Sequence, residues 1–148
     1  VTALAERAET DTDYINVASC VQMQFTAFED KEECKQFAHQ NYSKAIDAMD
    51  DVQYLIGLVG GHLNEEYYEN EELTTKAGEK ALASASTFQD YAYICFDDDE
   101  RCSFSDTEIY KTAAAKAVEL KDQADEDQMD RFKMMLDEWE DEETLGLL

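Results

Sequence analysis

The sequence predicts an all-α protein, an antiparallel bundle of four or five helices stapled by two disulfides. The 148 residues include no proline and only five glycines, so residues that interrupt helices are scarce. Apolar side chains recur at steps of three and four, as on the buried face of a helix. Four cysteines, an even number in a small chain, suit two disulfides. We expect residues 1–148 to form a single domain with a buried core.

The first helix is expected after the polar residues 10–13, which can cap its N-terminus. Residues 1–9 are then a short N-terminal arm, because so short a helix is marginal in water. The apolar stripe of this helix contains Tyr14, Val17, Val21 and Phe25, and it reaches Phe28 if the helix is long enough.

The end of the first helix is ambiguous in the sequence. Residues 26–29 and residues 30–33 both resemble helix starts. A turn near Ala27 would place Cys20 and Cys34 at similar heights on neighbouring antiparallel helices, whereas a later turn would offset them. We favour the earlier turn.

The second helix is expected to run to about Leu58. Gly60 and Gly61 would end it in the left-handed conformation that glycine adopts at low cost. An acidic connection, residues 62–72, follows. The stripe of this helix contains Cys34, Ala38, Tyr42, Ala45, Met49, Val52 and Ile56.

The chain is expected to be organised around the stretch from Asn70, a plausible cap, to Glu108. A long amphipathic helix would run to Cys95 and lead into a charged loop, residues 95–102. Ser105 and Glu108 match a capping box and would start the next helix. The stripe of the long helix contains Leu73, Ala77, Ala81, Ala85, Phe88, Tyr91 and Cys95.

The C-terminal part is predicted either as one long helix or as two helices separated at residues 125–127. We favour the break, because three acidic residues suit a helix N-terminus. Residues 142–148 are expected to form a frayed tail.

The cysteines are predicted to pair locally as Cys20–Cys34 and Cys95–Cys102, although the sequence permits all three pairings. They form no Cys-x-x-Cys pair and no Cys/His cluster of the zinc-binding type. Disulfides imply an oxidising compartment, so we expect a secreted, extracellular protein. Asn41 begins a glycosylation sequon, but it would lie within a helix.

The charge balance restricts the partners. Twelve basic and 36 acidic side chains give a formal net charge of −24. Such a polyanion repels nucleic acid and anionic lipid, and no apolar run is long enough to be inserted in a membrane. A basic protein, an amine or a metal ion would suit it, although a merely solvated surface explains the same composition.

The sequence gives little support for metal binding or catalysis. Residues 97–108 resemble a calcium loop in part, but Cys102 replaces the turn glycine and Arg101 occupies a ligand position. His39 and His62 lack the paired Glu-x-x-His motifs of metal-binding bundles. The sequence also lacks the glycine-flanked serine and the phosphate-binding loop of common enzyme families. We expect no metal, no cofactor and no enzymatic activity.

Surface recognition is the remaining possibility. Residues 65–72 interleave carboxylates with tyrosines, and Trp139 lies in an acidic helix end, a combination that suits binding to a basic surface. The predicted partner-binding residues are Glu65, Glu66, Tyr67, Tyr68, Glu69 and Trp139.

In its general character, acidic, helical and cysteine-containing, the chain resembles the small secreted salivary and haemolymph proteins of blood-feeding insects. The resemblance covers the whole chain but carries over no functional residue. It implies a non-enzymatic binding protein that recognises a basic extracellular or host protein, in haemostasis or immune modulation. The alternative is a carrier of a small hydrophobic or amine ligand in the bundle core.

Overall fold

A computed structural model describes residues 5–23, 31–65, 68–97 and 101–148, apart from the side chains of residues 20–23, 31, 64, 65, 68 and 69. The described residues form eight α-helices, which confirms the all-α class. The predicted turn after the first helix and the start of the N-terminal arm lie outside the described residues. The helices are α2 (Asp11–Met23), α3 (Lys31–Ala48), α4 (Val52–Leu58), α5 (Glu71–Ser84), α6 (Phe88–Cys95), α7 (Glu108–Glu119), α8 (Glu126–Glu138) and α9 (Glu142–Leu145).

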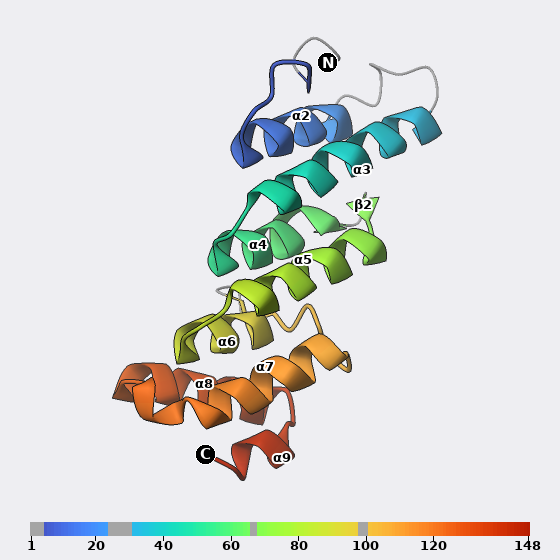
Figure 1. Cartoon of the computed structure of the whole chain (residues 1–148). Coiled ribbons are helices and arrows are strands. Elements are labelled where there is room, and N and C mark those ends of the chain that lie inside the picture. Colours follow the sequence, from blue (N-terminus) through green and yellow to red (C-terminus); the bar gives the residue numbers. More distant parts are fainter. Residues whose placement is uncertain (1–4, 24–30, 66–67, 98–100) are drawn as a thin grey trace.

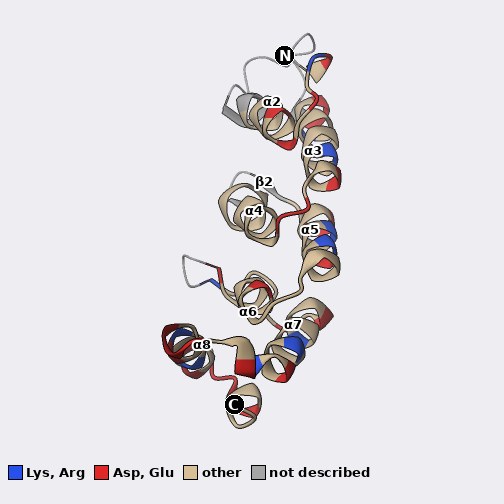
Figure 2. Cartoon of the chain, turned by 60° about the vertical axis from the view of Figure 1, so that its left-hand side comes forward, with Lys and Arg blue, Asp and Glu red and all other residues tan. Residues whose placement is uncertain are grey.

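The helices stack in pairs along one direction, from α2 at one end to α9 at the other (Figure 1). Seen along the helices, α2, α4 and α6 form one column, and α3, α5 and α7 form the second (Figure 2). The two helices of each pair contact each other, and along the columns α3 contacts α5, α4 contacts α6, α5 contacts α7 and α7 contacts α9. This arrangement is a short stack of the solenoid type, and it differs from the predicted bundle around a common axis.

The predicted second helix is divided into α3 and α4. Asp51 ends the continuity, because its side chain accepts a hydrogen bond from the backbone N–H of Tyr54 and caps α4. The last backbone carbonyls of α3, which have no partner within that helix, accept hydrogen bonds from a side chain of α5. Lys80 of α5 donates to the carbonyl oxygens of Ile46 and Asp47 at 2.8 and 2.6 Å.

The predicted long helix is also divided, into α5 and α6. Asn70 caps α5, as predicted. The division comes from a capping box in which Thr87 binds the backbone N–H of Asp90 while Asp90 binds the backbone N–H of Thr87. Since α6 lies in the opposite column from α5, the chain returns at this box to the column of α2 and α4 (Figure 2).

The C-terminal boundaries agree with the sequence in part. Asp125 caps α8 in a capping box with Gln128, so the predicted break is confirmed. The cap of α7 is Thr107, not the predicted Ser105, because the Thr107 hydroxyl accepts from the N–H of Tyr110. In place of the predicted frayed tail, the chain forms α9.

The glycine stop predicted after Leu58 is wrong. A π-helical turn, η1 (Val59–Leu63), continues from α4, and none of the described glycines has a positive φ. Gly60 lies close to two charged side chains. A Cβ at this position would lie 2.9 Å from the Asp97 carboxylate and 3.1 Å from the Arg101 guanidinium. The turn leads to two short antiparallel strands, β1 (Asn64–Glu65) and β2 (Tyr68–Glu69).

The predicted Cys95–Cys102 disulfide is wrong, because both residues are thiols in the structure. Cys95 is fully buried in the core at the end of α6. The loop after it is closed by Asp97, whose backbone N–H donates to the Arg101 carbonyl and whose side chain accepts from the Arg101 N–H. The side chain of Cys20 lies outside the described residues, so the structure gives no support to a Cys20–Cys34 bond.

The two columns are joined by one continuous apolar core. Its largest fully buried side chains include Tyr42, Phe88, Phe104, Ile56, Leu73 and Leu136. Two buried side chains pack directly against the backbone of α5 at Gly78. A Cβ there would lie 2.6 Å from Phe104 and 2.8 Å from Ile109.

We expect Gly78→Ala to lower the free energy of unfolding by about 1–3 kcal/mol, because the added methyl group overpacks the core. Gly57→Ala is the matched control, since a Cβ at Gly57 meets nothing within 4 Å. That substitution should raise stability by about 0.5–1 kcal/mol through helix propensity. Urea unfolding of both variants measures these changes in stability. Equal changes in the two variants would contradict close packing at Gly78.

Candidate recognition clefts

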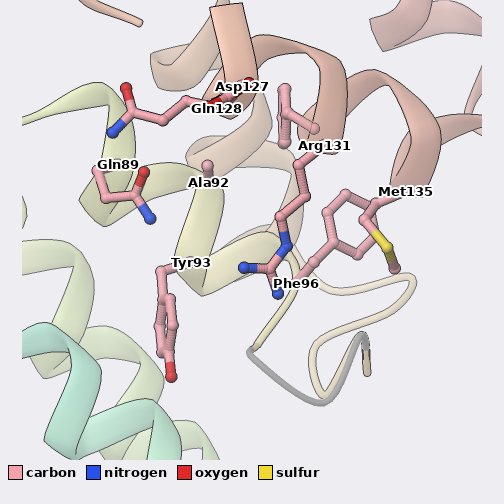
Figure 3. Close-up of a pocket in the computed structure, with 9 residues that line it drawn as sticks. Gln89, Ala92, Tyr93, Phe96, Asp127, Gln128, Arg131 and Met135 are labelled. Atoms are coloured by element: carbon pink, nitrogen blue, oxygen red, sulfur yellow. The ribbon is translucent and has the colours of Figure 1, made fainter. Parts of the chain in front are cut away.

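The structure has a first cleft between α6 and α8, which we call the α6–α8 cleft (Figure 3). Its volume is about 200 Å³. It is open to solvent and combines aromatic and polar side chains. The lining residues are Gln89, Ala92, Tyr93, Phe96, Asp127, Gln128, Arg131, Phe132 and Met135.

Aromatic rings form the apolar part of the α6–α8 cleft. The Phe132 ring lies 5.5 Å from Phe88 in an edge-to-face arrangement and 5.9 Å from Phe96. Because Phe132 is almost fully buried, it joins α8 to α6 at the base of the cleft. Above this base, Arg131 extends from α8 toward Tyr93 and Phe96 (Figure 3).

The loop after α6 is held by the buried carboxylate of Asp97. This side chain is 4% exposed, lies 3.4 Å from the Arg101 Nε and accepts from the Arg101 backbone N–H at 2.9 Å. Arg101 also donates to the Gly60 carbonyl at 3.1 Å. Asp97 was considered as the first calcium ligand, but here it faces a guanidinium. Asp99 of that loop lies outside the described residues.

The second cleft lies between α7 and α9, and we call it the α7–α9 groove. Its volume is about 540 Å³. Two large apolar side chains in it are exposed, Trp139 at 44% and Leu147 at 58%. Along α7 the groove is lined by small or apolar side chains and Lys111, and along the other side by carboxylates. The lining residues are Cys102, Ser105, Asp106, Tyr110, Lys111, Ala114, Ala115, Val118, Trp139, Glu140, Asp141, Glu143, Thr144 and Leu147.

Asp141 positions α9 as one wall of the α7–α9 groove. One carboxylate oxygen accepts from the Thr144 N–H at 3.0 Å and caps α9, while the other accepts from the Tyr110 hydroxyl at 2.7 Å. Burial raises the pKa of Asp141, but the hydrogen bonds from Thr144 and Tyr110 together outweigh it, so the pKa lies below its usual value. Burial, together with the bond to Asp141, raises the pKa of Tyr110 well above its usual range.

Two acidic residues of the α7–α9 groove have unusual backbone conformations. Asp106 has φ 62° and Glu140 has φ 58°, in the left-handed region that favours glycine. Glu140 follows the end of α8 in a Schellman motif, in which the Asp141 N–H donates to Leu136 and the Glu140 N–H donates to Asp137. Glycine is the usual residue at this position, so a glutamate here costs stability.

The cations of the chain do little to neutralise these surfaces. Lys76 binds Ser43 and Asp47 at 2.7 Å each, and Lys80 binds the end of α3. In the α7–α9 groove, Lys111 is paired with Glu108 at 2.9 Å. Much of the limited positive charge is therefore committed to contacts within the chain.

The predicted partner-binding residues do not form one site. Trp139 lines the α7–α9 groove, as described above. Glu65, Tyr68 and Glu69 lie in β1 and β2, in the half of the stack nearer the N-terminus (Figure 1). Glu66 and Tyr67 lie outside the described residues.

The two histidines have separate surroundings. The His39 ring nitrogen lies 3.1 Å from the Asn70 amide, and the His62 ring nitrogen lies 3.4 Å from the Tyr42 hydroxyl and 3.5 Å from the Ser19 hydroxyl. Within the described residues, no three His, Cys, Asp or Glu side chains gather closely enough to hold a metal ion.

The sequon residue Asn41 is 2% exposed, and its amide donates to the Phe37 carbonyl at 2.8 Å. The folded chain therefore leaves no room for a glycan on this side chain. In the described part of the chain, no helix combines the length and the apolar character that are needed to cross a bilayer.

No protein family, no curated protein and no solved structure matches the chain.

We expect the stabilising effect of Asp141 to depend on pH. Because its pKa is lowered on folding, its contribution is fully present above its unfolded pKa of about 3.9 and is lost as the pH falls through the folded pKa. Asp141→Asn should thus be less stable than the wild type at neutral pH, and the difference should shrink toward about pH 2. Urea unfolding at each pH measures the difference in the free energy of unfolding between the variant and the wild type. Asp122→Asn, at an exposed position in the 3₁₀-helical turn η2 (Lys121–Gln123), is the control, and a pH-independent difference for Asp141→Asn would contradict the expectation.

Proposed function

We propose that the protein is a non-enzymatic recognition module that binds a basic partner protein in the α7–α9 groove. The observation that carries this proposal is Glu140. Its carboxylate lines the groove at a backbone position where glycine is favoured. Residues held at such a cost concentrate at functional sites.

The apolar contribution comes from Trp139 and Leu147. Large exposed apolar side chains beside a groove are typical of protein interfaces, and tryptophan is prominent among the residues that contribute most to binding. The groove thus offers an aromatic anchor on one side and small side chains, Ala114 and Ala115, on the other.

The charges favour a basic partner. Asp106, Glu140 and Glu143 line the groove, and Lys111 is already paired with Glu108. The net charge of −24 adds a long-range attraction that speeds association with a cation and weakens as salt is added.

The shape favours a helix as the bound segment. Each of α3 and α5 is followed in its column by another long helix, whereas α7, with 12 residues, is followed by α9, with four (Figure 2). A partner helix that lies against Ala114 and Ala115 would extend this column. We infer an amphipathic helix with lysine or arginine on its polar face.

The extracellular setting and a role in haemostasis or immune modulation remain predictions from the sequence. The argument for secretion is weakened by the thiol state of Cys95 and Cys102. A basic helix would be bound by the same chemistry in any compartment.

We expect Glu140→Gly to separate stability from binding. Relief of the left-handed conformation should raise the free energy of unfolding by about 1 kcal/mol. Loss of the carboxylate should weaken binding of a cationic peptide at the same time. Glu138→Gly, within α8, is the control and should lower stability by about 1 kcal/mol. If Glu140→Gly binds as tightly as the wild type, Glu140 has no part in recognition.

The single tryptophan makes the groove directly observable. We expect a synthetic leucine–lysine peptide, patterned as an amphipathic helix, to shift the fluorescence of Trp139 to shorter wavelength. The affinity should fall as salt is raised to about 0.15 M and beyond. A scrambled peptide and a leucine–glutamate peptide should give no shift.

Ala115→Arg places a cation in the groove at an exposed position. It should lower the affinity for the leucine–lysine peptide at least about tenfold. Thr112→Arg adds the same charge to α7 at a position that does not line the groove. Equal affinities of these two variants would show that only overall charge matters and would overturn the proposed site.

A further inference from the structure

The α6–α8 cleft is separate from the α7–α9 groove and has a different lining. Helix α6 belongs to the column of α2 and α4, whereas α7 belongs to the other column (Figure 2). None of the described residues lines both clefts. An inference about the α6–α8 cleft is therefore independent of the proposed function.

The base of the cleft suits an aromatic ring. Phe132 lies edge-to-face on Phe88 at 5.5 Å and 5.9 Å from Phe96, so the base consists largely of ring surfaces. Met135 also lines the cleft, and the sulfur of a methionine makes favourable contacts with aromatic rings. A volume of about 200 Å³ is smaller than the pockets that hold drug-sized molecules. The cleft therefore has room for one ring with a short polar substituent.

Arg131 forms one side of the cleft, but its side chain is engaged within the folded chain. Its guanidinium donates to the Asp97 carbonyl at 3.4 Å, and Arg131 has further contacts besides this one. A ligand must therefore find its polar contacts on other side chains.

Gln128 supplies hydrogen-bond donors from α8. Its side-chain oxygen accepts from the Asp125 backbone N–H at 3.1 Å in the capping box of this helix. A glutamine amide also has two N–H donors, and no contact within the described residues uses those of Gln128. The cap thus fixes the oxygen of an amide whose NH₂ group can donate to a ligand.

Gln89 supplies a donor and an acceptor together from α6. It is partly buried and lies on the side of the cleft away from Arg131 (Figure 3). In the part of the chain that the structure describes, its side chain makes no hydrogen bond. A carboxamide presents its carbonyl oxygen beside its N–H groups, so it can form two parallel hydrogen bonds with a second amide.

This pattern of donors and acceptors favours a neutral amide as the polar end of the ligand. A carboxylate has no donor for the Gln89 oxygen, and it is repelled by Asp127 and by the net charge of −24. An ammonium group has no acceptor for the N–H groups of Gln89 and Gln128. An amide satisfies both glutamines and avoids the cost of unpaired polar groups.

We propose that the α6–α8 cleft binds a small neutral aromatic amide, with the amide on Gln89 and Gln128 and the ring against Phe96, Phe132 and Met135. This ligand and this surface cleft differ from the hydrophobic or amine ligand that the sequence suggested for the bundle core.

The test compares three compounds that share a phenylpropanoyl group. They are 3-phenylpropionamide, its methyl ester analogue, which is neutral but has no N–H donor, and 3-phenylpropionate, which is charged. Binding is followed by NMR of protein labelled at the methionine methyl groups. Met135 lines the cleft, whereas Met134, on the same helix, is 51% exposed and does not line it. The amide should shift the Met135 signal and leave that of Met134 unchanged. It should bind at least about fivefold more tightly than the ester, and the acid should bind most weakly.

Two variants test the role assigned to Gln89. Gln89→Leu should bring the affinities for the amide and the ester to within about twofold of each other, which loss of structure alone would not do. Gln89→Glu removes the N–H donors and adds a charge, so it should bind 3-phenylpropylamine more tightly than the amide. Gln53→Leu, at an exposed position of α4 outside the cleft, is the control and should keep the preference for the amide.

The Met135 signal of each unliganded variant shows whether the cleft is intact. Equal binding of the amide and the ester to the wild type, or equal shifts at Met134 and Met135, would overturn the proposal. So would an unchanged preference for the amide in Gln89→Leu or in Gln89→Glu.

Discussion

The buried carboxylate of Asp97 is the interaction on which much of the stack depends. A charge that is 4% exposed requires compensation, and Arg101 supplies it through its backbone N–H and its guanidinium. The same guanidinium binds the Gly60 carbonyl. Asp97 follows α6 and Gly60 follows α4, so this ion pair joins two successive helical pairs, and a Cβ at Gly60 would displace one of the two charged groups.

The short helices are stabilised by their ends and by their neighbours. An isolated helix of seven or eight residues, such as α4 or α6, is unstable in water. Asp51 and Thr87 bind the free N–H groups at the starts of these two helices. Burial against the adjacent pair supplies the rest of the stabilisation. The two clefts occur near the C-terminal end of this stack, where α8 and the four-residue α9 cover α6 and α7 incompletely.

Helix class and some boundaries could be predicted from the sequence, because they depend on local patterns. The caps Asn70 and Asp125 are examples. The capping box at Thr87 and Asp90 was also visible as a pattern, but the apolar stripe continued through it and suggested one long helix. Periodicity shows which face of a helix is buried. It does not show whether the helix ends and the chain reverses direction within the same apolar pattern. The stacked arrangement could not be predicted from periodicity alone.

The clefts were predictable only in part. The sequence predicts Trp139, in an acidic helix end, as a partner-binding residue, but it gives no sign that Ala114 and Ala115 line a groove with it. The left-handed conformation of Glu140 has no signal in the sequence, since glutamate gives no sign of a Schellman motif. Arg131 appeared as one charge among many, because its position beside Phe96 depends on how α8 lies against α6.

The paired stack also has a mechanical consequence. Helices α2 and α9 lie at opposite ends of the stack (Figure 1), and each pair of helices contacts mainly the pairs beside it. A force applied between the termini would separate one pair from the next, so the chain would lengthen in steps. In a bundle around a common axis, the same force would shear several interfaces at once. The protein is therefore built to yield gradually under tension.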